Sequence, residues 1–125
     1  MKFQPDSLAG VNTIARLDGQ RVWIGAQAYG GSVVVPWRGI VRPWLPARFG
    51  DLAQAHFDEL LQHEPELVIF GSGERLRFPK PALLRTLIEQ RIGVETMDTA
   101  AACRTFNVLA TEGRNVVAAL LLDTP

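Results

Sequence analysis

The second half of the chain contains three short runs that predict strands, two of them continuously apolar, separated by helical patterns, and this alternation constrains the fold more than any other feature of the sequence. The runs lie at residues 67–70, 94–97 and 116–122. The first is continuously apolar, which is typical of a central strand covered on both faces. Strands that alternate with helices favour an α/β sheet with the helices packed against it. We therefore expect an α/β fold with a βαβαβ C-terminal half.

Two helices are predicted before the second of these runs. The first is capped by Asp51 and continues to about residue 63, and the second has Pro81 in its first turn and a left-handed stop at Gly93. Helical spacing of their apolar residues predicts one buried face on each helix. The residues expected on these faces are Ala53, Phe57, Leu60, Leu61, Leu84, Leu87, Ile88 and Ile92.

The first third of the chain predicts β structure built around a hairpin. Asp18-Gly19 separates residues 13–17 from residues 21–24, and this pair readily adopts the positive backbone angles of a tight turn. Residues 32–35 form a further short β-branched run. Residues 36–50 contain three prolines, so we expect irregular or edge structure there.

Length, charge and cysteine content set the broad class of protein. A chain of 125 residues with 47% hydrophobic residues predicts a single domain, 1–125, that is large enough to be stabilised by one core. Thirteen basic residues balance 13 acidic ones, which argues against a general binder of nucleic acid or acidic membranes. One cysteine cannot form an internal disulfide, and no apolar run approaches the roughly 20 residues that span a bilayer. The first residues lack the apolar run of a signal peptide, so we expect a cytoplasmic location.

The loop after the first apolar run is a candidate ligand site. Gly71-Ser72-Gly73 follows a strand and precedes a helix, which is where α/β folds commonly place ligands. The loop lacks the third glycine of a dinucleotide fingerprint, and the chain has no phosphate-binding loop motif. A tight turn at the strand end is the alternative interpretation.

The start of the last predicted helix is the second part of this candidate site. Asp98 or Thr99 caps a helix that continues to about residue 112, and three alanines at residues 100–102 leave its first turn uncrowded. A small anion could approach there, but an Asp98 carboxylate used as the cap would occupy the free N–H groups and repel it. Polar residues farther along the helix form one stripe, which is either solvated or part of a pocket. The predicted pocket residues are Gly71, Ser72, Gly73, Thr96, Asp98, Thr99, Arg104 and Asn107.

A segment at residues 36–49 interleaves aromatic residues with three arginines and contains no acidic residue. That composition suits a protein-binding surface or a base-stacking patch, although two tryptophans could also close one end of the core. We expect partial burial with an exposed fringe of Arg and Trp, and a protein partner rather than nucleic acid because the chain is neutral overall. The residues predicted for this surface are Trp37, Arg38, Arg42, Trp44 and Arg48.

No catalytic constellation is evident in the sequence. Cys103 has no local base beside it, so its small size suits packing in a core. His56, Glu59 and His63 would share a helix face, but the two imidazoles would be about 10.5 Å apart along the axis, too far to hold one metal ion. We therefore predict no catalytic residue, no metal and no cofactor.

The pattern from Val94 to Leu109, followed by residues 112–116, resembles a known family. This small and largely uncharacterised family includes mitochondrial respiratory complex I assembly factor 3 and the adipogenesis-associated domain protein, and it has many bacterial members. Residues 65–67 leading into Gly71-Ser72-Gly73, where the family usually has Gly-Thr-Gly, extend the resemblance, as does the early Gly-rich and Trp-containing β segment. The resemblance covers nearly the whole chain.

The resemblance implies a compact three-layer α/β domain around a mixed central sheet, with an N-terminal β-rich half. It also implies function through protein contacts, because the mitochondrial member helps to assemble a respiratory complex. No established reaction, cofactor or catalytic residue comes with the family. The chain looks like a bacterial cytoplasmic member.

Two functions follow as hypotheses. The first is a non-enzymatic interaction protein, similar to an assembly factor, with an unidentified protein partner. The alternative is a small-ligand-binding or enzymatic domain whose pocket is formed by the Gly71–Gly73 loop and the N-terminus of the last helix. The residues do not indicate the oligomeric state.

Overall fold

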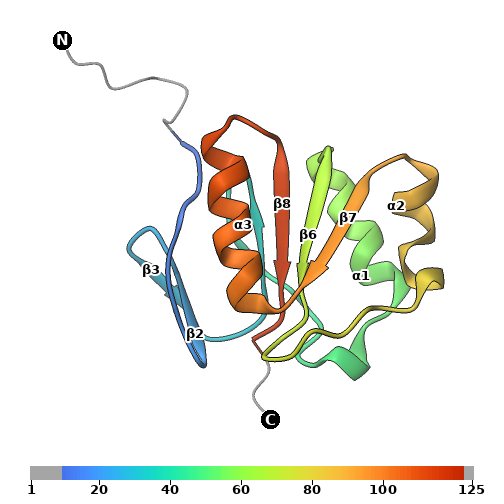
Figure 1. Ribbon diagram of the computed structural model, residues 1–125, viewed down its shortest axis with the longest axis horizontal. Helices are drawn as coiled ribbons and strands as arrows, with labels where there is room; N and C mark the ends of the chain where they lie inside the picture. Colours follow the sequence, from blue (N-terminus) through green and yellow to red (C-terminus); the bar gives the residue numbers. More distant parts are fainter. Residues whose placement is uncertain (1–9, 123–125) are drawn as a thin grey trace.

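The computed structural model describes residues 10–122, which form two β-sheets and the helices that cover them (Figure 1). The larger sheet has five strands in the order β5-β4-β8-β6-β7. Strand β6 lies parallel to both β7 and β8, and β4 lies antiparallel to β8 and β5, so the sheet is mixed, as predicted. These strands are β4 (Val33–Pro36), β5 (Arg42–Pro43), β6 (Leu67–Gly71), β7 (Gly93–Met97) and β8 (Val116–Leu120).

The smaller sheet contains the predicted hairpin. Strands β1 (Ile14–Asp18) and β2 (Arg21–Ile24) pair antiparallel around Gly19, whose φ of 53° is the left-handed conformation that glycine adopts without strain. A third strand, β3 (Gln27–Tyr29), pairs with β2 and was not predicted. The N-terminal third is therefore a small antiparallel sheet of its own.

The domain has three layers because the strands of the larger sheet bury side chains on both faces. Helix α3 (Thr99–Thr111) and the hairpin sheet cover one face. The opposite face is covered by α1 (Gln54–Asp58) and α2 (Arg85–Glu89), together with the short 3-10 helices η3 (Glu59–His63) and η4 (Pro81–Leu84). Alternation along β4 shows the division: Val33 and Val35 pack in the first cluster, and Val34 packs in the second.

The first predicted helix begins later and is less regular than expected. Asp51 lies in a separate 3-10 helix, η2 (Phe49–Asp51), where its Oδ2 accepts a hydrogen bond from the N–H of Arg48 at 3.2 Å. Helix α1 begins at Gln54, with Nδ1 of His56 accepting from the N–H of Ala53 at 2.9 Å. Phe57 and Leu60 are buried as predicted, whereas Ala53 is exposed.

The second predicted helix has Pro81 in its first turn as expected, there as the 3-10 helix η4, but it differs at its C-terminal end. The predicted stop at Gly93 is wrong: Arg91 adopts the left-handed conformation, and Gly93 is the first residue of β7. Ile88 was expected inside but is 57% exposed, while Leu87 is fully buried. Both residues lie in α2, where consecutive side chains point about 100° apart, so a face centred on Leu87 leaves Ile88 at its margin.

Candidate functional site

The Gly71–Gly73 loop and the start of α3 lie together at the carboxyl end of β6. The backbone N–H of Gly73 donates to Oγ1 of Thr99 at 2.8 Å, and the N–H of Thr99 donates to the carbonyl of Gly73 at 2.9 Å. The Thr99 hydroxyl in turn donates to the carbonyl of Leu121 at 2.8 Å. A Cβ on Gly71 would lie only 2.9 Å from Oγ1 of Thr99, so this glycine permits the close approach of helix and strand.

A pocket of about 260 Å³ opens beside this junction. Three of the predicted site residues line it: Gly73, Asp98 and Thr99. Of the two residues expected to cap α3, Asp98 and Thr99, it is Asp98 that does so, because its Oδ1 accepts from the N–H of Ala101 at 2.8 Å. The carboxylate therefore already occupies a free helical donor. The other lining residues are Leu17, Gly19, Glu74, Ala100, Leu121 and Leu122.

The remaining predicted residues have other positions. Ser72 is fully buried; its hydroxyl donates to the carbonyl of Arg75 at 2.7 Å and accepts from the N–H of Arg77 at 3.0 Å, which fixes the loop. Thr96 lies within β7, opposite Phe70 of β6. Neither residue lines the pocket beside Thr99.

Arg104 and Asn107 line a second hollow of about 350 Å³, between α3 and β1. The side chain of Asn107 accepts from the N–H of Ile14 and donates to the carbonyl of Ile14, both at 2.8 Å. Sequence patterns did not indicate that the hairpin forms one wall of the site, because these contacts join residues that are far apart in the chain. Leu17 and Ala100 line both hollows.

Cys103 lies in the wall of this second hollow but is only 6% exposed. Burial raises the pKa of its thiol to about 11, and the nearby positive charge of Arg104 only partly opposes this effect. The thiol is therefore protonated at neutral pH and is a poor nucleophile. Within residues 10–122, no group of three or more His, Cys, Asp or Glu side chains is placed to hold a metal ion.

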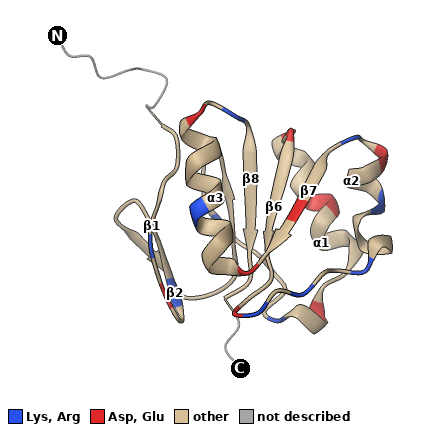
Figure 2. Cartoon of the chain, in the orientation of Figure 1, with Lys and Arg blue, Asp and Glu red and all other residues tan. Residues whose placement is uncertain are grey.

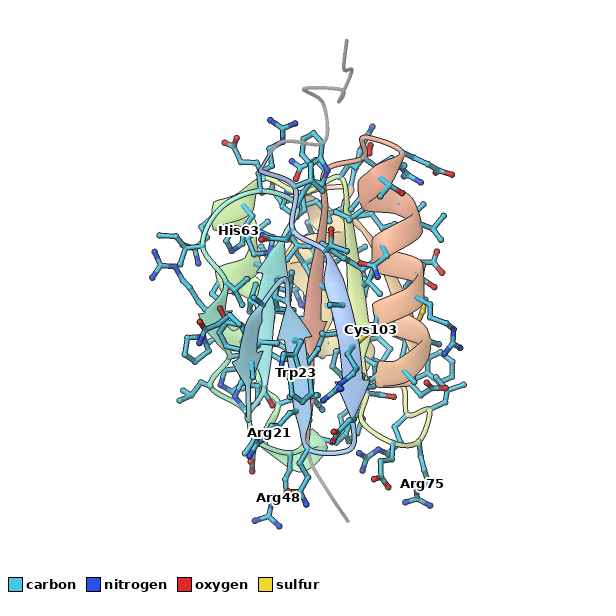
Figure 3. All side chains as sticks on the ribbon, turned by 90° about the vertical axis from the view of Figure 1, so that its left-hand side faces the viewer. Arg21, Trp23, Arg48, His63, Arg75 and Cys103 are labelled. Carbon is cyan, nitrogen blue, oxygen red and sulfur yellow. The ribbon has the colours of Figure 1, made fainter. Side chains whose placement is uncertain are left out.

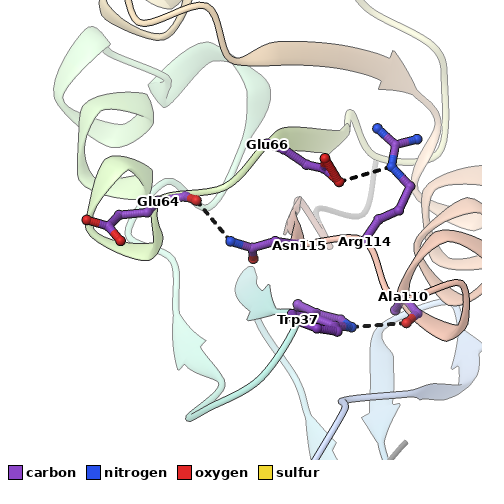
Figure 4. Close-up of polar contacts among 6 residues, drawn as sticks. All are labelled: Trp37, Glu64, Glu66, Ala110, Arg114 and Asn115. Atoms are coloured by element: carbon purple, nitrogen blue, oxygen red, sulfur yellow. Dashed lines mark hydrogen bonds and ion pairs between the residues drawn. The ribbon is translucent and has the colours of Figure 1, made fainter. Parts of the chain in front are cut away.

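The structure corrects one residue of the predicted Trp and Arg surface. Trp44 is only 3% exposed; its ring packs edge-on against Phe57 and Phe70, and its Nε1 donates to the carbonyl of His56 at 3.2 Å. It therefore belongs to the core and cannot contribute to an interaction surface. Trp37 is half-buried, with Nε1 donating to the carbonyl of Ala110 at 3.0 Å (Figure 4).

The arginines of that segment are exposed. Arg38, Arg42 and Arg48 all lie on the surface, and Cζ of Arg38 is 4.6 Å from the centre of the Trp37 ring. Two large apolar side chains are exposed between these arginines: Ile40 at 69% and Leu45 at 81%. Acidic and basic residues are otherwise spread over the hairpin, helices and loops (Figure 2). Sequence reasoning missed Ile40 and Leu45, because an apolar residue gives no local sign of whether it is buried.

Residues that carried the family resemblance link the N-terminal ends of strands β6 and β8 (Figure 4). Nε of Arg114 lies 3.1 Å from Oε1 of Glu66, and Nδ2 of Asn115 donates to the carbonyl of Glu64 at 2.9 Å. The N–H of Glu66 also donates to the carbonyl of Asn115 at 2.9 Å. This part of the pattern therefore has a structural role.

Comparison with known proteins agrees with the resemblance expected from the sequence. NADH dehydrogenase [ubiquinone] 1 alpha subcomplex assembly factor 3 of Bos taurus is 34% identical over 99 residues, which are 78% of this chain and 53% of that protein. The chain thus spans about half the length of the curated relatives it matches. No helix within residues 10–122 has the length and apolar character needed to cross a membrane.

Solved structures and a family model extend this agreement over most of the chain. A crystal structure of a Bordetella parapertussis protein has a TM-score of 0.86 at 31% identity and covers 90% of this chain and 97% of that one. An NMR structure of a Xanthomonas campestris protein has a TM-score of 0.79 at 34% identity and covers 89% and 84%. The model of the family described as "Protein of unknown function (DUF498/DUF598)" matches residues 14–121. The chain therefore belongs to the DUF498/DUF598 family.

Proposed function

We propose that this chain is a non-enzymatic interaction protein that binds another protein in the manner of an assembly factor. Its curated relative in Bos taurus is named as an assembly factor, which supports a role through protein contacts. The buried thiol of Cys103, with a pKa near 11, supports a role that does not depend on nucleophilic chemistry.

The exposed part of residues 38–48 carries this proposal. Ile40 and Leu45 expose most of their side chains to water, and three arginines lie around them in the sequence without an acidic residue. Protein interfaces combine a desolvated apolar centre with arginines, which bind carboxylates and carbonyls of the partner. We call Arg38, Ile40, Arg42, Leu45 and Arg48 the arginine surface.

Native mass spectrometry of the chain, purified gently from its own host after mild cross-linking in the cell, tests this proposal. We expect a complex with a second protein. The double variant Ile40→Ser/Arg42→Glu should lose that protein, since it removes an apolar contact and reverses a charge. Arg85→Glu on α2, an arginine that is also exposed but lies outside the arginine surface, should retain it. Retention of every partner by the double variant would contradict the proposal.

The pocket beside Thr99 favours a second candidate function, the binding of a small ligand. Its volume of about 260 Å³ is close to the lower end for ligand sites, and it combines the carboxylates of Glu74 and Asp98 with the apolar side chains of Leu121 and Leu122. The same mass spectra test this alternative, because a bound small molecule would add a constant mass that disappears on denaturation. A species without such added mass would count against it.

A further inference from the structure

A groove runs between strand β1 and helix α3, which lie side by side in Figures 1 and 3. Two neighbouring hollows of about 260 and 350 Å³ form it, and Leu17 and Ala100 line both of them. One wall is the edge of β1 from Ile14 to Leu17. The other wall is the face of α3 that carries Ala100, Cys103, Arg104 and Asn107.

The edge of β1 presents backbone groups to this groove. In the hairpin, Asp18 pairs with Arg21 across a two-residue turn, and antiparallel pairs alternate between those that exchange hydrogen bonds and those that do not. The N–H and C=O of Leu17 therefore point away from β2 and towards α3. After the irregularity between Ile14 and Arg16, the same holds for Ile14.

Asn107 already does at Ile14 what a neighbouring strand would do. Its amide both accepts from the N–H and donates to the C=O of Ile14, at 2.8 Å each. At Leu17, no group of the described residues outside the hairpin provides the equivalent pair of bonds. The outward backbone groups of β1 therefore have hydrogen-bond partners at Ile14, whereas those of Leu17 have none among the described residues outside the hairpin.

The helical wall and the base of the groove offer open space, a positive charge and an apolar surface. Ala100 is small and exposed, which leaves room opposite Leu17. Arg104 is exposed in the same wall and has no ion pair within residues 10–122. Leu121 and Leu122 provide an apolar base at the end nearest the loop after β6. The carboxylates of Glu74 and Asp98 also line that end, so an acidic side chain of a ligand fits only at the Arg104 end.

We propose that this groove binds an extended segment of a partner protein, which adds as a strand to the edge of β1 at Leu17. The segment carries an acidic side chain opposite Arg104 and an apolar side chain over Leu17 and Leu122. Addition of a strand to a sheet edge draws affinity from main-chain hydrogen bonds and specificity from alternate side chains, which matches this combination of strand edge, charge and apolar base. The inference goes beyond the proposed function, because it needs no residue of the arginine surface.

A random seven-residue peptide library displayed on phage, selected against the full chain, supplies the probe. The strongest binder is then synthesised and titrated into isotope-labelled protein. We expect an acidic residue in the selected peptides and amide chemical-shift changes at Leu17, Ala100 and Arg104. Hydrogen exchange of the Leu17 amide should slow when the peptide binds, because its N–H gains an acceptor.

Two variants with matched controls test the placement of the peptide. Ala100→Phe places a large side chain where Ala100 lines both hollows, and we expect it to weaken binding about tenfold or more. Val108→Phe places the same side chain at an exposed position of α3 that lines neither hollow, and it should bind like the wild type. Arg104→Glu should also weaken binding about tenfold, whereas Arg85→Glu should not.

Three outcomes would overturn the inference: recovery of no binding peptide, unchanged exchange of the Leu17 amide, or unchanged affinity of a correctly folded Ala100→Phe protein. A peptide that instead perturbs the arginine surface would also overturn it, while supporting the proposed function. Loss of a host partner in Ile40→Ser/Arg42→Glu would have no bearing on the groove. The two proposals therefore succeed or fail separately.

Discussion

Cys103 shows how burial sets the chemistry of a single side chain. Removal from water raises the pKa of its thiol from the ordinary 9.0 to about 11. The folded state therefore keeps this proton over a range of pH in which the unfolded chain loses it. This difference in proton binding contributes at most about 2.7 kcal/mol to the free energy of unfolding. The contribution is fully present below pH 9 and is lost as the pH rises towards 11.

We predict that the stability advantage of the wild type over Cys103→Ala shrinks as the pH rises from 8 to 11. Urea denaturation of both proteins at a series of pH values measures it, and the comparison removes contributions from other groups that titrate in this range. The advantage should be largest at pH 8, where the thiol is protonated in both states. An advantage that is constant with pH would show that the thiol has an ordinary pKa in the folded protein.

Individual residues were predictable where their role depends on neighbours in the chain. Asp98 was expected as a helix cap because a cap bonds to the N–H groups two or three residues later, and it does so at Ala101. The arginines and prolines around Trp44 favour an interaction surface with partial burial, although they also allow a tryptophan that closes one end of the core. Its actual environment, the rings of Phe57 and Phe70, comes from two other elements that no local pattern connects to it.

At the scale of elements, Asn107 fastens the hairpin to α3. Its two hydrogen bonds satisfy both backbone groups of Ile14, which is buried. We predict that Asn107→Ala lowers the free energy of unfolding by about 1–3 kcal/mol, because it leaves a donor and an acceptor without partners. Hydrogen exchange of the Ile14 amide should also become faster.

Thr111→Ala provides the control for this change. Thr111 lies one turn farther along α3 and is exposed, and its hydroxyl bonds only to carbonyls of its own helix. We expect the hairpin amides of the Thr111→Ala protein to exchange their hydrogens as fast as those of the wild type. Equal stability of the two variants would show that the bonds to Ile14 do not hold the hairpin.

Elements with regular periodicity were predicted well, and irregular ones were not. The strand β6 and the helix α3 follow from a continuous apolar run and a capped helical pattern. The segment expected as one helix from Asp51 is divided among a 3-10 turn, a five-residue α-helix and another 3-10 turn. The pattern of one regular helix located the buried Phe57 and Leu60, but it failed at Ala53, which precedes α1 and is exposed.

For the whole molecule, the topology explains which part of the candidate site was predictable. Strands β6 and β7 are parallel neighbours, so the loop after β6 and the helix after β7 must meet at one edge of the sheet. Gly73 and Thr99 do meet there. The hairpin wall was not predictable, because the chain connection leaves the hairpin free to pack on either face, and only contacts such as that of Asn107 decide between them.

The two hydrophobic cores, one on each face of the larger sheet, are built on the same strands, and we therefore predict that they unfold together. Strands β4, β6 and β8 each contribute alternate residues to the core on either side, so neither core can persist without the sheet. Trp37 packs against the core under α3, and Trp44 lies in the core under α1 and α2. Each is a natural fluorescent probe of one face.

Two variants isolate these probes among the three tryptophans of the chain. Trp23→Phe/Trp44→Phe retains Trp37, and Trp23→Phe/Trp37→Phe retains Trp44. For each variant, urea unfolding is measured twice, by tryptophan fluorescence and by far-UV circular dichroism. We expect the two transitions to have the same midpoint, because a single cooperative unit has one transition. Comparison within each variant removes the effect of the substitutions on stability. A fluorescence transition that precedes the dichroism transition in only one variant would show that this face melts first and that residues 10–122 do not unfold as one unit.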